Sequence, residues 1–289
     1  MKEILEHANE ENYAVPAPVT QTELNARTAI KCAEEMNSPI ILLIPLIFDY
    51  DVDLFGRYLK SLAEKATVPV AVNHDHGSDF ESAVSCIRAG VSSIMTDRSQ
   101  LPYEENVAQV KELVKVAHAV GVSVEAELGH VGMANNYSED RDAALTEPEL
   151  AKKFIDETGI DCLAVAIGTA HGAYNKGQEP YLDFDRLVEI KKATNNFPLV
   201  LHGGSGTSDE GLAKVAKLGI NKVLTFKEKF SYRLYQHVKK SSESSVYIPM
   251  ETLRHLLEIK DSYKRYYDIE KNLLMPVLKD LEDNGHLPL

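Results

Sequence analysis

The chain has 289 residues, which is enough for one large α/β domain or two small ones. Its composition, 44% hydrophobic and 26% charged residues, is ordinary for a globular protein. The formal net charge is −13 and the sequence has no sustained stripe of Lys and Arg, which argues against a nucleic-acid partner or an anionic membrane surface. An anionic substrate is not excluded, because a local pocket can oppose the overall sign.

Cysteine usage and the N-terminal segment indicate a cytoplasmic protein. Cys32, Cys86 and Cys162 are odd in number, far apart and in apolar contexts, so we expect reduced thiols that fill the core. The N-terminal stretch MKEILEHANEEN is acidic and lacks the apolar run of a signal peptide. No uninterrupted apolar run approaches the roughly 18–20 residues of a membrane span.

Short β-type runs alternate with amphipathic helical patterns along most of the chain. Strands are predicted at 13–18, where prolines weaken the pattern, and at 39–45, 69–74, 92–96, 122–128, 162–167, 197–202 and 222–226. Helices are predicted at 21–36, 55–65, 79–89, 105–119, 147–157, 183–193 and 208–217. From about residue 228 the pattern becomes almost continuously helical.

Alternation of strands and helices indicates βα units and a parallel sheet, and eight such runs predict a single (β/α)8 TIM barrel. We expect the barrel to occupy 1–235 and the residues 236–289 to form a C-terminal helical extension of the same domain. A doubly wound open sheet is the alternative fold. It would need a Gly-rich phosphate loop after its first strand, and the sequence has none there.

Polar residues fall repeatedly where the predicted strands end, which is where a (β/α)8 barrel carries its chemistry. The candidates, in strand order, are Asp75 and His76, then Asp97, then Glu125 and Glu127, then His171, and finally His202. Three imidazoles that converge above the barrel axis and leave a fourth position open describe a catalytic zinc-type site. Nearby carboxylates can bind another cation or orient the histidines. The sequence therefore predicts a metal centre.

The segment LHGGSG (201–206) has two interpretations. It can be a tight turn, or its glycines can let backbone N–H groups approach an anion, with a hydroxyl from Ser205. Beside a metal ligand, we favour a phosphate or carboxylate cradle that includes Gly203, with Gly172 in the preceding loop.

Two further histidines are candidates for the site. His74 would share a side of a regular strand with His76 and support it, and His130 lies in a loop that could cover the substrate. The remaining histidines, which we expect at the surface, are His7, His118, His237, His255 and His286.

From about residue 10 to residue 235, the chain resembles the class II, zinc-dependent fructose-bisphosphate and tagatose-bisphosphate aldolases. The segments that carry the resemblance are DHG (75–77), the DxS turn of Asp97 and Ser99 with LPYEEN (97–106), VEAELG (124–129), TGIDCLAVAIGTAHGAY (158–174), LDFDRL (182–187) and PLVLHGGSG (198–206). Several of these segments are long and specific.

The resemblance implies a carbon–carbon lyase that cleaves a ketose phosphate or bisphosphate by retro-aldol chemistry through a zinc-stabilised enediolate. It implies zinc ligands at His76, His171 and His202, a proton-transfer carboxylate at Asp75, a second or alternative metal position at Asp97 and Glu127, and phosphate contacts at Gly172, Gly203 and Ser205. Cobalt, manganese or iron are alternative metals, and a monovalent cation often assists. The family is usually dimeric or tetrameric.

After the eighth strand the sequence departs from the family pattern. The family's Asn, which contacts the bound ketone, is Leu224, and the family's Thr, which contacts phosphate, is Lys227. Only the acidic position persists, as Glu228. Leu224 cannot donate a hydrogen bond, whereas Lys227 can still meet an anion, so we assign Lys227 and Glu228 to the substrate site. The family's Glu-Asp pair has either moved to Glu139-Asp140 or been replaced by Asn135-Asn136.

Three functions follow from this combination. The first is a class II aldolase acting on a phosphorylated ketose with a rearranged anion site. The second is a metal-dependent lyase of the same fold acting on a different ketone or 2-oxo acid. The third is a non-catalytic descendant, such as a metal-holding sensor or assembly subunit.

Overall fold

The computed structural model describes residues 1–45, 51–77, 79–131, 145–171, 180–204 and 207–224. The chain divides into two units, Met1–Thr225 and Phe226–Leu289, and all the described residues belong to the first. The predicted helical extension at 236–289 and the predicted boundary at residue 235 therefore lie outside the described residues and stay predictions.

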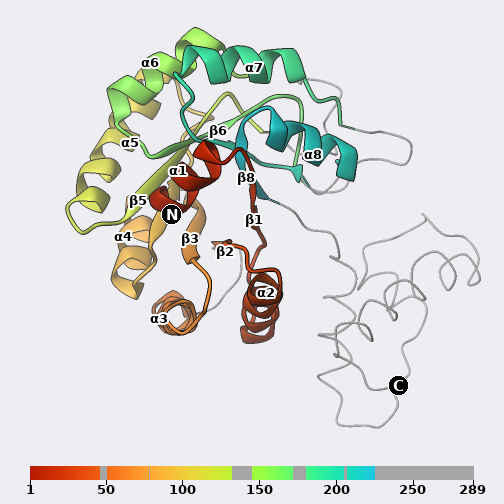
Figure 1. Cartoon of the computed structure of the whole chain (residues 1–289). Coiled ribbons are helices and arrows are strands. Elements are labelled where there is room, and N and C mark those ends of the chain that lie inside the picture. The colour runs from red at the N-terminus through yellow and green to blue at the C-terminus, as the bar shows by residue number, and fades with distance from the viewer. Residues whose placement is uncertain (46–50, 78, 132–144, 172–179, 205–206, 225–289) are drawn as a thin grey trace, which may run out of the picture. The chain divides into compact units, whose positions relative to one another are not determined.

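Parallel strands and helices alternate along the described part of the chain (Figure 1). The strands are β1 (Val15–Ala17), β2 (Ile40–Pro45), β3 (Val70–Gly77), β4 (Ser93–Thr96), β5 (Ser123–Leu128), β6 (Cys162–Val165), β7 (Leu199–Leu201) and β8 (Ile220–Leu224). The helices are α1 (Lys2–Glu10), α2 (Glu23–Glu35), α3 (Val52–Ala63), α4 (Phe80–Ala89), α5 (Tyr103–His118), α6 (Pro148–Thr158), α7 (Phe184–Ala193) and α8 (Asp209–Lys217).

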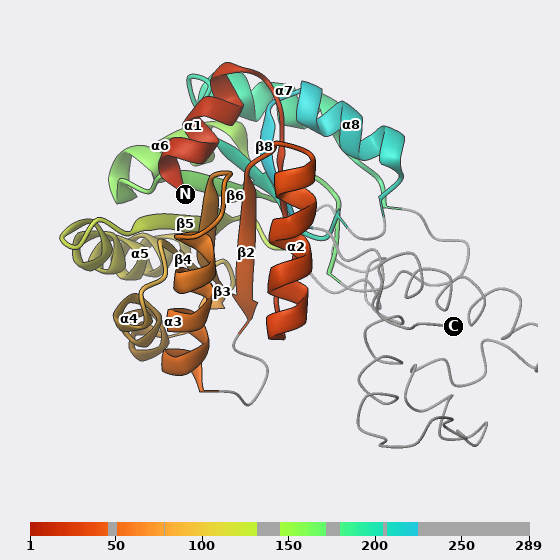
Figure 2. The ribbon, with the colours of Figure 1, turned by 60° about the horizontal axis from the view of Figure 1, so that its bottom comes forward.

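The eight strands form one parallel sheet that curls into a nearly closed barrel. The strand order is β1-β8-β7-β6-β5-β4-β3-β2, so every neighbour pair except β1–β8 joins strands that are consecutive in the chain. The gap between β1 and β2 is bridged just beyond β1, where Val19 pairs with Leu43 and Thr20 N donates to Leu43 O at 2.8 Å. This is the predicted (β/α)8 TIM barrel, with its helices arranged around the strands (Figure 2).

Alternation along each strand separates two apolar layers. On β2, Leu42 and Ile44 belong to the cluster between barrel and helices, whereas Ile41 and Leu43 belong to the cluster inside the barrel. Side chains of a strand point alternately to its two faces, so one strand supplies both layers. On β5 the outward positions are apolar, and the inward positions hold the two buried glutamates of VEAEL.

The N-terminal helix α1 was not among the predicted helices. Its Leu5 and Ala8, together with Met1, belong to the same buried cluster as inward residues such as Ala164 and Val200. The helix therefore closes part of the barrel core with an apolar face whose members are three or four residues apart. The acidic residues between them hide this pattern in the sequence.

The other predicted elements match the observed ones with small shifts. β1 is limited to three residues, with Pro16 in its middle and Pro18 directly after it, and β8 begins two residues earlier than predicted. Five helices begin at a side-chain cap, supplied by Thr22, Asp51, Asp79, Asp183 and Ser208. Among the cysteines, Cys86 and Cys162 are buried as expected, but Cys32 is exposed because it lies on the outer face of α2.

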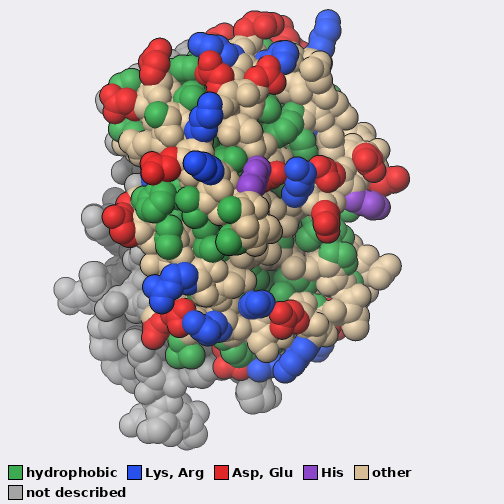
Figure 3. Space-filling view, turned by 90° about the vertical axis from the view of Figure 1, so that its left-hand side faces the viewer, with side chains coloured by type: hydrophobic (Ala, Val, Ile, Leu, Met, Phe, Trp, Pro, Cys, Tyr) green, Lys and Arg blue, Asp and Glu red, His purple; other side chains and the backbone are tan. Residues whose placement is uncertain are grey.

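The surface carries mixed charge where Figure 3 displays it. Acidic and basic side chains are interspersed over this face, without a block of one sign. Among the described helices, none combines the length and the apolar character that a membrane crossing requires.

Candidate active site

Candidate side chains from five strands gather at one end of the barrel. Asp75 and His76 lie at the C-terminal end of β3, Asp97 follows β4, Glu127 lies on β5, His171 follows β6 and His202 follows β7. Because parallel strands end on the same side of the barrel, residues far apart in the sequence meet there.

Three histidine rings pack edge-to-face around one point. The ring centroid of His76 lies 4.8 Å from that of His171 and 4.7 Å from that of His202. The centroids of His171 and His202 are 5.6 Å apart. One nitrogen from each ring lies within 4.8 Å of the others. The structure thus brings together the three imidazoles that the sequence predicted as metal ligands.

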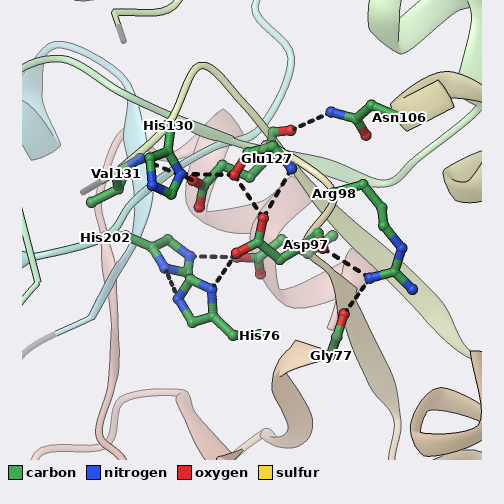
Figure 4. A network of polar contacts seen from close by, with 11 residues as sticks. His76, Gly77, Asp97, Arg98, Asn106, Glu127, His130, Val131 and His202 are labelled. Atoms are coloured by element: carbon green, nitrogen blue, oxygen red, sulfur yellow. Dashed lines mark hydrogen bonds and ion pairs between the residues drawn. The ribbon is translucent and has the colours of Figure 1, made fainter. Parts of the chain in front are cut away.

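Each of two rings is oriented by a carboxylate on its far side. His76 Nδ1 lies 2.9 Å from Asp97 Oδ2 (Figure 4). His202 Nε2 lies 2.8 Å from Glu125 Oε1. A carboxylate only accepts, so these nitrogens carry the hydrogens. The remaining nitrogens, His76 Nε2 and His202 Nδ1, then face each other at 2.9 Å. Two lone pairs at this distance repel unless a proton or a metal cation lies between them.

The third ring is poised to bind a cation. His171 Nε2 is buried and has no hydrogen-bond partner among the described residues. Burial, with His202 and His76 nearby, lowers the pKa of His171 to about 3, so the ring is neutral. A neutral imidazole with an unused, buried nitrogen is the form that coordinates a metal. The donor set and this orphaned nitrogen therefore fit a divalent metal ion such as zinc.

A second group of possible ligands shares His76. His76, Asp97 and Glu127 each offer one donor atom within the same 4.8 Å limit. Glu127 Oε1 accepts from Val131 N at 3.0 Å, and its Oε2 is buried without a partner among the described residues. The structure brings Asp97 and Glu127 together with His76, and their use as an alternative metal position stays a prediction.

The acidic surroundings act on His76. Burial would lower the pKa of His76, but the hydrogen bond with Asp97 and the charges of Asp75 and Glu127 raise it to about 9. Burial would raise the pKa of Asp97, but His76 and Ser99 hold it well below its usual range. The site therefore attracts positive charge, as a proton or as a metal ion.

Asp75 lies beside the histidines but outside their hydrogen bonds. Its side chain is buried, and Oδ1 has no partner among the described residues. A buried carboxylate oxygen without a partner is costly unless another group binds it. This oxygen is therefore positioned to bind a group of a substrate molecule.

The end of β3 is irregular at the residues that matter. His76 has a positive φ of 46°, and the pairing with β4 shifts between His74 and Gly77. Arg98 holds this bend through a 2.7 Å hydrogen bond to Gly77 O. A β-bulge of this kind re-aims a side chain next to an active site.

The bulge separates His74 from His76, although a regular strand would put them on one side. His74 is fully buried, its ring lies against Gly77, and neither ring nitrogen has a hydrogen-bond partner among the described residues. Burial lowers the pKa of His74 to about 4. No described hydrogen bond links His74 to the three candidate metal ligands.

At the mouth of the site, no role was predicted for Ser99 from the sequence, and the role of His130 was left open. Ser99 Oγ donates to Asp97 Oδ1 at 2.8 Å and lies 3.0 Å from His130 Nδ1. His130 also lies 3.7 Å from Glu127 Oε1, so it stands at the edge of the second ligand group (Figure 4). The turn after β4 was the available signal for Ser99, because a short polar side chain there can fold back onto Asp97.

Of the five predicted substrate and phosphate contacts, one, Gly203, lies within the described residues. Gly203 has a φ of 67°, and an added Cβ would lie 2.6 Å from Ala170 O, so a glycine is needed where these two loops touch. Leu224 lies in the apolar cluster inside the barrel, at the end of β8. The predicted contacts Gly172, Ser205, Lys227 and Glu228 lie outside the described residues.

Comparisons with known proteins agree with this geometry. The family model for class II fructose-bisphosphate aldolase matches residues 1–272. A fructose-bisphosphate aldolase from Thermus caldophilus is 44% identical over 211 residues, which cover 72% of this chain and 69% of that protein. A probable fructose-bisphosphate aldolase from Bacillus subtilis (strain 168) is 41% identical over 239 residues, covering 77% of this chain and 79% of that protein.

Solved structures lead to the same family. The crystal structure of the YdjI aldolase from Escherichia coli K12 has a TM-score of 0.73 and 32% identity, covering 90% of this chain and 95% of that one. The structure of a putative fructose-1,6-bisphosphate aldolase from Coccidioides immitis has a TM-score of 0.73 and 28% identity, covering 99% and 98%. The chain therefore belongs to the class II fructose-bisphosphate aldolase family and is a metal-dependent aldolase, a carbon–carbon lyase.

Proposed function

We propose that this aldolase uses a zinc ion held by His76, His171 and His202 to cleave a ketose phosphate or bisphosphate. The observation that carries the proposal is the meeting of three imidazole nitrogens, one of them a buried nitrogen of His171 without a partner among the described residues. Cobalt, manganese and iron suit the same ligands, so the metal is to be identified by analysis of the protein as purified.

A bound zinc ion would supply Lewis-acid stabilisation of the negative charge that develops on the ketone fragment during carbon–carbon cleavage. The chain's own residues supply the rest. Asp97 and Glu125 keep two of the rings oriented. Asp97 and Glu127, with His76, offer a second or alternative cation position.

Asp75 is the proposed proton-transfer group. It would take and return the proton at the carbon of the cleaved bond, as a general acid–base next to the metal. Its buried Oδ1 without a partner among the described residues supports this role, because a substrate group would satisfy it.

The phosphate contacts are proposed on the glycine loops. Gly203 in LHGGSG would offer backbone N–H to a phosphate, together with Gly172 and Ser205, and Lys227 and Glu228 would complete the substrate site with the help of a monovalent cation. Burial of Leu224 in the barrel leaves the usual amide contact to the ketone without a replacement at that position. A phosphorylated ketose with a rearranged polar contact is therefore the substrate class we propose.

We further propose that the protein acts in the cytoplasm as a homodimer or homotetramer. The reduced cysteines support the location, since no described cysteine is in a disulfide. Size-exclusion chromatography with light scattering measures the oligomeric state directly.

Proton exchange tests the proposed chemistry. The zinc-loaded protein is incubated with dihydroxyacetone phosphate in D₂O, and loss of the C3 proton signal is followed by NMR. Metal-dependent exchange is the expected result. If bound zinc gives no exchange, the nucleophilic substrate is a different ketone or a 2-oxo acid, and exchange on none of these would contradict aldolase chemistry altogether.

Two variants separate metal binding from proton transfer. His202→Ala should lose zinc and exchange together, since one of three ligands is removed. Asp75→Ala should bind zinc with an affinity within about threefold of the wild type. Its exchange rate should fall by at least about 100-fold, in line with the usual contribution of a general acid–base. Normal exchange in Asp75→Ala would show that another group moves the proton.

A further inference from the structure

A buried ion pair lies beneath His202 inside the barrel. Glu125 on β5 and Lys222 on β8 are both fully buried, as is His202. Glu125 Oε1 lies 2.8 Å from His202 Nε2, and Glu125 Oε2 accepts a hydrogen bond from Lys222 Nζ. The three side chains form a chain of hydrogen bonds from His202 through Glu125 to Lys222.

Stability does not explain this pair. Taking a carboxylate and an ammonium group out of water is costly, and apolar residues of similar volume often serve as well or better. The residues in register with Glu125 on the neighbouring strands are Met95 and Cys162, and both belong to the apolar cluster inside the barrel. Stability therefore does not account for a charged pair at these positions, whereas its contact with His202 gives it a functional role.

Comparison with Asp97 explains why a lysine is needed. The Asp97 side chain is 21% exposed near the mouth of the site, so water and Ser99 compensate its charge. The Glu125 side chain is 0% exposed, so its charge requires a partner within the barrel. Lys222 occupies one oxygen of Glu125 and leaves the other directed at His202 Nε2.

We propose that Glu125 and Lys222 are positioning residues that fix His202 with Nδ1 toward the metal. Glu125 accepts the hydrogen of Nε2, which sets both the tautomer and the angle of the ring. Lys222 balances the charge of Glu125 and holds its carboxylate in place. The inference rests on the proposed metal site, since positioning has meaning only for a ligand.

A double-mutant cycle on the full chain tests this. Glu125→Gln and Lys222→Met each leave one buried charge without its partner, so each should weaken Zn²⁺ binding by about 10- to 100-fold, measured by competition with a chromophoric chelator. The double variant keeps an amide oxygen that accepts from His202 and strands no charge. It should recover zinc affinity to within a few-fold of the wild type.

A second readout separates positioning from loss of fold. In the metal-free protein, ¹⁵N shifts of the His202 ring should report the Nε2–H tautomer in the wild type and the double variant. Lys191→Met is the matched control, because Lys191 is a part-buried lysine that binds Asn9, Phe197 and Asn221 away from the histidines. It should lower stability and leave zinc affinity unchanged.

The outcomes distinguish this inference from the proposed function. Failure of the wild type to bind zinc refutes the proposed zinc site, whatever the variants do. If the wild type binds zinc and the single variants bind it equally well, only the positioning role is refuted. A folded double variant that stays as weak as the single ones also overturns it, since the neutral acceptor would then not suffice.

Discussion

Gly77→Ala should weaken metal binding although Gly77 has no side chain that could bind a metal. An added Cβ would lie 2.3 Å from His74 Cε1 and 2.9 Å from the backbone oxygen of Met95. Contacts below 3.0 Å essentially do not occur for real Cβ atoms, and one of the two crowded atoms belongs to the backbone, which cannot rotate away as a side chain can. The bulge that carries His76 must therefore shift.

The size of the effect follows from this crowding. Overpacking of a buried position costs about 1–3 kcal/mol, and Gly77 has no positive φ, so backbone strain adds nothing. A shifted His76 also loses its alignment with Asp97, for which we expect at least about tenfold weaker zinc binding. Zinc should accordingly raise the melting temperature of this variant less than that of the wild type.

Gly56→Ala is the matched control. An added Cβ at Gly56 would lie 2.6 Å from the Cβ of Ala89, where α3 packs on α4, so it is crowded in the same way but away from the site. Chemical denaturation gives the stability of each variant, and chelator competition gives its zinc affinity. The reasoning fails if folded Gly77→Ala binds zinc within twofold of the wild type, or if Gly56→Ala loses as much affinity.

The remaining predictions concern the ligands, the metal and a buried carboxylate at a distance from the site. His171→Ala should bind zinc at least about 100-fold more weakly, because two imidazoles remain of three, and elemental analysis after gel filtration checks this; stoichiometric zinc in this variant would exclude His171 as a ligand. Removal of zinc by a chelator should lower the free energy of unfolding by about 2.7 kcal/mol when free zinc stood at 100 times its Kd, and calorimetry that finds no shift would contradict metal binding to the folded state. Asp161→Asn should cost about 1–3 kcal/mol at pH 7, because Asp161 is buried and accepts from Val124 N and His118 Nε2, both at 2.8 Å. Burial would raise the pKa of Asp161, but these bonds and Lys2 hold it below the ordinary 3.8, so its contribution is present above that value and is lost as the pH falls through the folded pKa. The gap in stability between wild type and Asp161→Asn should therefore narrow below about pH 4, and a gap that widens there would refute the sign.

Hydrophobic periodicity was sufficient to predict the barrel. Continuous apolar runs such as IILLI predict strands that are buried on both faces, as in a parallel sheet. The amphipathic stretches between them predict the helices that cover those strands. The helix α1 escaped this reasoning, since its few apolar residues, Met1, Leu5 and Ala8, become a buried face only when the end of the barrel is there to receive them.

The candidate ligands were also predictable, for a topological reason. Parallel strands end at one side, so His76, His171 and His202 had to approach each other once the barrel was assigned. The identity of the partner groups was not predictable in the same way. Asp97 and Glu127 were candidates by their place at strand ends, and the resemblance implied their metal role, whereas the contact of Ser99 with Asp97 depends on how the turn after β4 folds back.

Two features were decided by tertiary structure alone. The bulge in β3 turns His76 into the site and buries His74 elsewhere, which the period of a regular strand predicts wrongly. The link from Lys222 through Glu125 to His202 joins residues 77 and 97 positions apart, and no local pattern records it. Sequence periodicity determines which face of a strand a residue occupies, but the side chain that it meets across the barrel is determined only when the sheet closes.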